Sequence, residues 1–563
     1  MAGTGIRFGF VGALALQTGC YAGLGGDDAV GDGGTTDGGD PAQGDSSGGG
    51  DDEADGGEPA DPEAPDPQRV AISGARRLTA AEYTATVRTL LDLEVDASLL
   101  LPEDPRTPYD NDFTLQHASE ALIAGAELLA SDLATASLET DAGRGLVVGC
   151  EPTAPDDAEC FAAFVDGFGP RVLRRPLTDE QRDALMALQA VGVEQDDFYA
   201  GVEAAVRGLL QHPQFLYRIE RGTAVEGSDV LALDDWEVAS RLSYLLWGDM
   251  PDAALFADAA DGALTSEVGI VTATERMLDD PRTLRQVQRF HALWMDFEQL
   301  PHSAELSDAL SRETAALIER VVFDEQRPWV ELLLASETYL DETLAEHYDL
   351  PTPAGGEGWI EYPDDSRRQG LLSHGSFLSM GGAFDDTSPT QRGIAIRTRL
   401  FCEPDYSPPP EIDADNPPVS ETSPCKWDRY VAHREDPGCA ACHQQYDPIG
   451  FGLENYGPDG RYRTHDVGLP QCEIQSEGEV VGIGTFSGPL ELANLLVADG
   501  RIEDCVAKQF YRFAHGRFEL GNADAAAIDG LLAEEEPLVF DQMILDMVRA
   551  PEFRHRREET PED

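Results

Sequence analysis

Apolar side chains recur every three or four residues along much of the chain. Tyr83, Val87 and Leu90, for example, fall near one face of a helix. The stretches with this spacing include 78–93, 198–219, 234–248, 281–297, 313–325 and 504–517. Only 479–488, "EVVGIGTFSG", has the pattern of a β-hairpin. The pattern therefore predicts a mainly α fold with a minor β-hairpin.

Polar residues mark where two of these helices begin. Thr79 is followed three residues later by Glu82, and Thr178 by Gln181. A threonine with a glutamate or glutamine at this spacing forms a capping box. We expect helices to start directly after both threonines.

The first 20 residues are typical of a signal peptide. Arg7 precedes a short apolar run, 8–16, and small or polar residues lead to Cys20. The ending "LQTGC" resembles a bacterial lipobox with Cys20 as the lipidation site, although Leu16 stands one place further from the cysteine than usual. Secretion without a lipid, with Cys20 lost or incidental, is the alternative. Either ending predicts an exported protein.

Residues 21–68 are rich in Asp, Glu and Gly and contain no Lys or Arg. Such a segment cannot offset its ordering entropy, so we expect a disordered tether. No later apolar run reaches about 18 residues, so the expected membrane attachment is a lipid anchor without a transmembrane helix.

The chain is strongly acidic, with 106 Asp and Glu against 40 Lys and Arg in 563 residues. The resulting field repels phosphate backbones, which argues against nucleic acid as a partner. The charge favours solubility or a basic partner.

The stretch "CAACH" carries the strongest chemical signal. Cys439, Cys442 and His443 have the Cys-x-x-Cys-His spacing of a c-type haem site. There, two thioethers would hold one covalent haem c and the histidine would ligate its iron. Zinc and thioredoxin-like interpretations have less support, because the sequence shows no second Cys-x-x-Cys and no strand-helix-strand setting.

The second axial ligand of such an iron is not evident locally, because no Met follows His443 until Met543. The candidates are Met380, His374, His465 and His515. Methionine would raise the reduction potential, a second histidine would lower it, and an open position would permit peroxide chemistry. The sequence leaves this choice open.

Residues after the motif are interpreted as parts of a haem pocket. Pro448 and Gly450 are expected to break the helix that carries His443. The side chains that would line the haem, or fill a small core, are Phe451, Leu453 and Tyr456. The side chains that would pair with haem propionates, or lie solvated, are Arg461 and Arg463.

The order of these stretches resembles a known family. The sequences "RRLTAAEYTATVRTLL", "FGPRVLRRPLTDEQ", "GLLQHPQFLYRIE" and "CAACHQQYDPIGFGLENYGPDGRYR" follow one another. This order resembles the multi-module exported cytochrome-c-like proteins of planctomycetes and myxobacteria, which are built from consecutive domains of unknown function. The resemblance covers nearly everything from Arg76 onward. It implies a bacterial exported haem protein and supplies no substrate.

The expected architecture is a multi-domain helical chain with a small c-type-cytochrome-like module near its C-terminus. Its segments are a signal peptide (1–20), a tether (21–68), helical modules (69–145, 146–225 and 226–350), a helical module with a Pro-rich linker (351–424), the haem module (425–470), and a hairpin with a C-terminal helical module (471–563).

The other six cysteines are an even number, as expected for disulfides in an oxidising compartment. Cys150 and Cys160 flank a short polar loop that a bridge could close. The remaining four, which allow three pairings, are Cys402, Cys425, Cys472 and Cys505.

Hydrolase motifs such as Gly-x-Ser-x-Gly and His-Glu-x-x-His are absent from the sequence. Asp385 and Asp386 could bind a ligand, but the following "SP" is better explained as a helix N-cap. The leading hypothesis is a lipid-anchored mono-haem c-type protein at the outer membrane or cell surface, otherwise periplasmic. It would act in electron transfer or as an accessory redox unit, with an unknown redox partner. The alternative is a non-enzymatic binding or scaffold protein with a structural or vestigial haem site.

Overall fold

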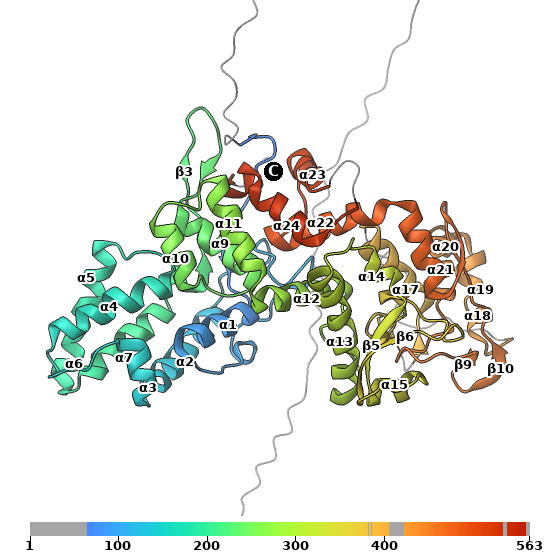
Figure 1. Ribbon diagram of the computed structural model, residues 1–563, viewed down its shortest axis with the longest axis horizontal. Helices are drawn as coiled ribbons and strands as arrows, with labels where there is room; N and C mark the ends of the chain where they lie inside the picture. The colour runs from blue at the N-terminus through green and yellow to red at the C-terminus, as the bar shows by residue number, and fades with distance from the viewer. Residues whose placement is uncertain (1–64, 381, 384–385, 405–421, 533–536, 559–563) are drawn as a thin grey trace, which may run out of the picture. The chain divides into compact units, whose positions relative to one another are not determined.

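The computed structural model describes residues 65–380, 382–383, 386–404, 422–532 and 537–558, all within one unit, Asp61–Asp563. These residues are mainly helical with small sheets, which confirms the predicted fold class (Figure 1). Cys20, the signal peptide and nearly all of the tether lie outside the described residues. Asp385 and most of the Pro-rich linker also lie outside them.

The first helices share one apolar core. Phe161 and Phe164 are fully buried in it. Thr79 and Thr178 form the predicted capping boxes at the starts of α1 and α5. The elements are α1 (Ala80–Leu91), η1 (Ala97–Leu99), α2 (Glu120–Ser137), α3 (Asp141–Val148), α4 (Ala158–Leu173), α5 (Asp179–Ala187), α6 (Gln189–Gln195), α7 (Phe198–Leu210) and α8 (Pro213–Leu216).

A larger core joins the central helices to the C-terminal ones. The ring of Phe290 in α12 (Pro281–Met295) lies 5.7 Å from that of Phe510 in α22 (Arg501–His515) and 5.8 Å from that of Phe540 in α24 (Phe540–Arg549). Ile449 and Leu453, which follow the Cys-x-x-Cys-His motif, belong to the same core. The motif is therefore carried by a segment that shares its core with distant helices.

The central elements precede the segment 405–421. They are α9 (Asp235–Trp247), α10 (Ala253–Ala260), α11 (Glu267–Leu278), α12 (Pro281–Met295), α13 (Ala304–Ile318), η2 (Glu319–Asp324), α14 (Glu331–Leu334), α15 (Glu342–Tyr348), η3 (Leu371–Ser373), α16 (Gly375–Leu378), α17 (Pro389–Ala395) and η4 (Ile396–Leu400).

The C-terminal elements follow that segment. They are α18 (Lys426–Arg429), α19 (Val431–Glu435), α20 (Pro437–Phe451), α21 (Gly488–Asp499), α22 (Arg501–His515), α23 (Gly521–Asp529), α24 (Phe540–Arg549) and η5 (Pro551–Arg554). In Figure 1, α22 and α24 (red) lie beside α12 and α11 (green), which they contact.

Short antiparallel strands lie between the helices. The predicted hairpin forms from β11 (Glu477–Val480) and β12 (Gly484–Ser487). The sequence pattern indicated this hairpin alone, but the structure has further strand pairs. The sequence did not indicate them because their strands are too short, or too far apart along the chain, to show an alternating pattern. These are β1 (Arg76–Arg77) with β2 (Tyr217–Arg218), β4 (Leu231–Ala232) with β3 (Thr223–Ala224) and β13 (His555–Arg556), β5 (Glu337–Asp341) with β6 (Glu357–Glu361), β7 (Gly382–Ala383) with β8 (Asp386–Thr387), and β9 (His465–Asp466) with β10 (Leu469–Glu473).

The two ends of the described chain meet. Arg557 forms a parallel bridge with Ile72, directly after β13 pairs with β4. The guanidinium of Arg76 donates a hydrogen bond to the carbonyl of Ala514 in α22 at 2.6 Å. The first and last modules are therefore held together by backbone pairing and by a buried arginine.

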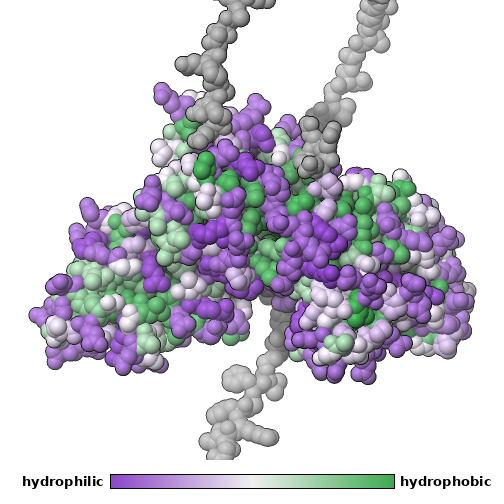
Figure 2. All heavy atoms as spheres, viewed as in Figure 1, coloured by the Kyte–Doolittle hydropathy of each residue, from purple (hydrophilic) through white to green (hydrophobic). Residues whose placement is uncertain are grey.

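Helix length and surface polarity bear on membrane contact. Within the described ranges, no single helix is long and apolar enough to cross a bilayer. Only α2 and α3 taken together reach that length, and they bend by 111° at their junction. On the face drawn in Figure 2, hydrophilic residues are spread throughout, with apolar residues in scattered groups between them.

Candidate functional site

The Cys-x-x-Cys-His motif lies in the first half of α20. Its spacing of three and four residues places Cys439, Cys442 and His443 along one side of the helix. Cys439 is half-buried, Cys442 is exposed, and neither is in a disulfide. The side chain of His443 is 22% exposed. Two free thiols and an imidazole are thus accessible together on one helix.

The prediction that α20 breaks at Pro448 and Gly450 was wrong, because the helix continues to Phe451. Glycine is needed at 450 for close packing: a Cβ there would lie 1.8 Å from the carbonyl oxygen of Pro389, at the start of α17. Pro448 removes one helical hydrogen bond, but burial of Ile449 and Phe451 in this last turn keeps the helix intact.

An acid one turn later holds the imidazole of His443. Nδ1 of His443 lies 3.0 Å from Oδ1 of Asp447. Oγ1 of Thr390, in α17, donates to the same carboxylate oxygen at 2.6 Å. Among the described residues, no hydrogen bond or ion pair engages Nε2 of His443. A carboxylate on one nitrogen of a histidine orients the ring and leaves the other nitrogen for a metal.

A second histidine packs against the first. The ring centroid of His433, in α19, lies 3.8 Å from that of His443, with a tilt of 39° between the rings. Nδ1 of His433 lies 3.4 Å from Oδ2 of Asp447, without hydrogen-bond geometry. The potential ligand atoms of all three residues lie within 4.8 Å of one another.

The carboxyl group of Asp447 is charged at neutral pH. Burial alone would raise its pKa, but His433, His443 and Thr390 hold the pKa below its usual value. Neither Asp447 nor His433 was predicted from the sequence. The four-residue spacing from His443 to Asp447 was a usable signal, whereas His433 comes from a separate helix with no periodic relation to the motif.

The side chains expected to line a haem or fill a core have the contacts of core residues. Leu453 is 1% exposed and belongs to the larger core. The ring of Phe451 packs 4.8 Å from that of Trp427 and 5.4 Å from that of Tyr430. Tyr456 is also 1% exposed.

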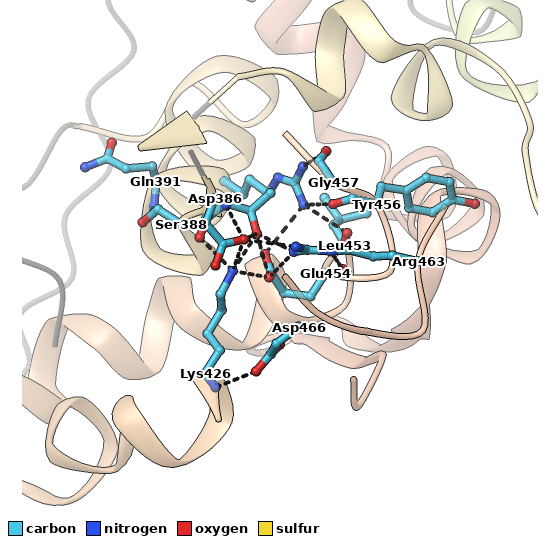
Figure 3. Close-up of polar contacts among 12 residues, drawn as sticks. Asp386, Ser388, Gln391, Lys426, Leu453, Glu454, Tyr456, Gly457, Arg463 and Asp466 are labelled. Carbon is cyan, nitrogen blue, oxygen red and sulfur yellow. Dashed lines mark hydrogen bonds and ion pairs between the residues drawn. The ribbon is translucent and has the colours of Figure 1, made fainter. Parts of the chain in front are cut away.

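Arg463 belongs to a buried ion network (Figure 3). Its guanidinium lies 2.9 Å from both Asp386 and Glu454, and Nζ of Lys426 reaches the same two carboxylates at 2.9 and 2.7 Å. The expectation for Arg463 was therefore wrong, because the half-buried Asp386 and the buried Glu454 engage its guanidinium in place of solvent or a propionate. The side chain of Arg461, in contrast, is 60% exposed.

The same network explains the acid at 386 and the turn after it. Burial alone would raise the pKa of Asp386, but Lys426 and Arg463 bring it to about 2. Ser388 caps α17 with Pro389 at its first position, as predicted. Asp386 is thus engaged in structural ion pairs at the start of α17.

The four candidates for a second axial ligand have other surroundings. His374 and His515 are buried, Met380 lies in the larger core, and His465 is exposed. Of the described residues, the aromatic ring in contact with His443 is instead that of His433.

The donor set of α20 fits a c-type haem. Two free thiols and an unengaged Nε2 are the groups that covalent attachment and proximal ligation use. Asp447 already fixes the other nitrogen of His443. His433 is not placed as the opposite axial ligand, because the two rings are 3.8 Å apart and no iron fits between them.

Disulfides are present as expected. Cys150 is joined to Cys160, and the four remaining cysteines adopt one of the three possible pairings. The bridges are Cys150–Cys160, Cys402–Cys505 and Cys425–Cys472. The last of these precedes Lys426 directly, so it helps to fix the ion network beside α20.

A cleft of about 560 Å³ lies between α12, η4 and the end of α22. Its arginines are paired with acids: Arg399 with Asp296 at 3.0 Å, and Arg512 with Glu519 at 2.6 Å. The cleft is therefore polar, with much of its charge neutralised in pairs.

Fold and site together describe a helical, multi-module, disulfide-bearing protein with a thiol and imidazole cluster. Four family models match consecutive parts of it, each described as a protein of unknown function. They are PSD3 (DUF1587) at 76–138, PSD5 (DUF1595) at 160–220, PSD4 (DUF1592) at 233–350 and PSCyt3 (DUF1588) at 368–466. The multi-module order is thereby confirmed, and α20 falls within the PSCyt3 range. No curated protein and no solved structure matches the chain.

Proposed function

We propose that this chain is a mono-haem c-type protein that acts in electron transfer or as an accessory redox unit. The observation that carries the proposal is the placement of two free thiols and His443 on one side of α20, with Nδ1 of the histidine held by Asp447. The name of the matching PSCyt3 model, which hints at a cytochrome-like domain, supports the same conclusion.

Each residue of the cluster has a distinct task in this proposal. Cys439 and Cys442 form the thioethers, and Nε2 of His443 ligates the iron. Bound haem c would supply one-electron chemistry. Asp447, held in turn by Thr390 at 2.6 Å, makes Nε2 more basic and fixes the orientation of the ring.

The proposal extends to the compartment in which the protein works. Disulfides persist in oxidising compartments, and a signal peptide cleaved before Cys20 would deliver a lipid-anchored chain to the outer membrane or cell surface. We include export and the anchor at Cys20 in the proposal. Recovery of the full chain in the membrane fraction of the producing cell tests them.

Covalent haem attachment tests the central claim. The full chain, produced with a cytochrome-c maturation system, should keep a haem band through a denaturing gel, because thioethers survive unfolding. Replacing both cysteines, Cys439→Ala with Cys442→Ala, should abolish the band, and His465→Ala at an exposed histidine should leave it. Haem that washes out of the unaltered chain would refute the assignment.

A further inference from the structure

Buried atoms without hydrogen-bond partners point to a second kind of occupant for this cluster. We propose that, in the haem-free chain, His433, His443 and Asp447 bind one divalent transition-metal ion, with Zn²⁺ as the reference case. This inference does not rest on the proposed haem function, because it uses neither Cys439 nor Cys442.

The spacing of the ligand atoms suits such an ion. Two ligands that each lie about 2.1 Å from a tetrahedral Zn²⁺ are about 3.4 Å apart. Nδ1 of His433 lies 3.4 Å from Oδ2 of Asp447, and Nδ1 of His443 lies 3.0 Å from Oδ1. Small side-chain movements would therefore place the three residues around one ion.

A second observation is that Nδ1 of His433 and Oδ2 of Asp447 face each other without a hydrogen bond. Among the described residues, neither Nδ1 of His433 nor Oδ2 of Asp447 has a hydrogen-bond partner, although both atoms are buried. The side chain of Asp447 is 0% exposed. A buried polar atom left without a hydrogen bond destabilises the fold, and a charged atom does so more strongly. One bound cation would satisfy both atoms.

The ligand types select the class of ion. Two imidazoles with one carboxylate suit Zn²⁺ and similar transition metals, whereas Mg²⁺ and Ca²⁺ prefer sets made of oxygen atoms. Thr390 donates to Asp447 and so orients the carboxylate from outside the ligand set. Because both histidine side chains are 22% exposed, water can fill a fourth position.

The ion and a haem iron would compete for one residue. A neutral imidazole has a single unprotonated nitrogen, so His443 can serve only one metal at a time. The two occupants differ in their other partners, which are the cysteines for haem and His433 with Asp447 for the ion. Variants at these positions therefore separate the two proposals.

The test titrates Zn²⁺ into the full chain, produced without a haem maturation system, against a chromophoric chelator. We expect one ion per chain, with no competition from excess Mg²⁺. His433→Gln should weaken binding at least tenfold. The double variant Cys439→Ala with Cys442→Ala should bind as the unaltered chain does, and so should His465→Ala, which removes an exposed histidine outside the cluster.

Each alternative result is decisive. Unchanged affinity in His433→Gln, or lost affinity in the double cysteine variant, overturns the proposal. Circular dichroism checks that each variant keeps its fold, and Asp447→Asn is a second ligand variant that must also lose affinity. In the haem attachment test the pattern is reversed: the double cysteine variant loses haem and His433→Gln retains it. Failure of one proposal is thus distinguishable from failure of the other.

Discussion

Glu313, in α13, has a fully buried side chain, with 0% of its surface exposed. Thr338 and Tyr348 donate hydrogen bonds to it at 2.6 and 2.8 Å. Burial nevertheless dominates and raises its pKa to about 7. The neighbouring His374 cannot compensate with a positive charge, because burial lowers its pKa to about 3. At this site the protein is therefore most stable with a neutral acid.

A pH dependence of stability follows for Glu313. Its pKa is 4.5 when unperturbed and about 7 when folded, so the folded state holds a proton that the unfolded state releases between these values. The contribution to stability is complete below pH 4.5 and is lost as the pH rises towards 7. Glu313→Gln mimics the neutral acid and should remove a loss on the order of 3 kcal/mol. Urea unfolding from pH 5 to 8 measures it.

The useful quantity is the difference in unfolding free energy between variant and unaltered chain at each pH, because other groups titrate in both. That difference should move in favour of the glutamine variant as the pH rises. Glu305→Gln, at an exposed position at the start of the same helix, is the control and should show no such trend. A flat difference for Glu313→Gln would mean that the buried acid is already ionised at pH 5.

At the scale of elements, the contact between α17 and α20 places Thr390 beside Asp447. Two glycines allow it: a Cβ on Gly450 would lie 1.8 Å from the carbonyl oxygen of Pro389, and one on Gly393 would lie 2.0 Å from that of Tyr446. At both glycines the atoms that a Cβ would meet belong to the backbone of the facing helix, so no flexible side chain can move aside to make room.

Gly450→Ala should therefore separate the two helices. We expect the chain to lose about 1–3 kcal/mol of stability, as overpacked sites do, despite the better helix propensity of alanine. Thermal unfolding measures this. Gly208→Ala in α7 is the matched control, since a Cβ there would have no described atom within 4 Å apart from its chain neighbours and the nearby backbone of its own helix, and it should be neutral or slightly stabilising. Equal effects of the two substitutions would contradict the close-contact explanation.

Helices and their starts were predictable because they depend on local order. The capping boxes at Thr79 and Thr178 and the cap at Ser388 all lie within four residues of their partners. Gly450 could not be interpreted correctly, because glycine breaks helices in isolation and only the facing backbone of α17 reveals its packing role. Arg463 was expected to pair with a propionate or to lie solvated for the same reason: its partner Asp386 stands 77 residues earlier in the sequence.

On the scale of the whole molecule, modules that match separate families share their interior. The larger core draws residues from Ala71 to Phe553 and includes Leu453 from the segment after α20. The bridge Cys402–Cys505 fastens the end of η4 to α22 across the same region. The sequence predicted the number of disulfides, but it could not distinguish the three possible pairings of the last four cysteines. Only the folded arrangement selects one of them.

The disulfides should differ in their effect on stability according to the length of chain they close. Their sequence separations are 10 for Cys150–Cys160, 47 for Cys425–Cys472 and 103 for Cys402–Cys505. On the chain-entropy estimate these loops correspond to about 3, 4 and 5 kcal/mol of stabilisation. Replacing each pair by serine should therefore lower the thermal midpoint least for the first and most for the third. The shared core strengthens this expectation, because Cys402 and Cys505 restrain the unfolded chain between modules that must pack against each other during folding.

Calorimetry of the three double-serine variants under non-reducing conditions measures the order of their thermal midpoints. The fully reduced unaltered chain, which lacks all three bridges, sets the lower limit of the midpoint. A larger loss from the 10-residue loop than from the 103-residue loop would show that local strain or packing, and not chain length, decides the contribution of each bridge.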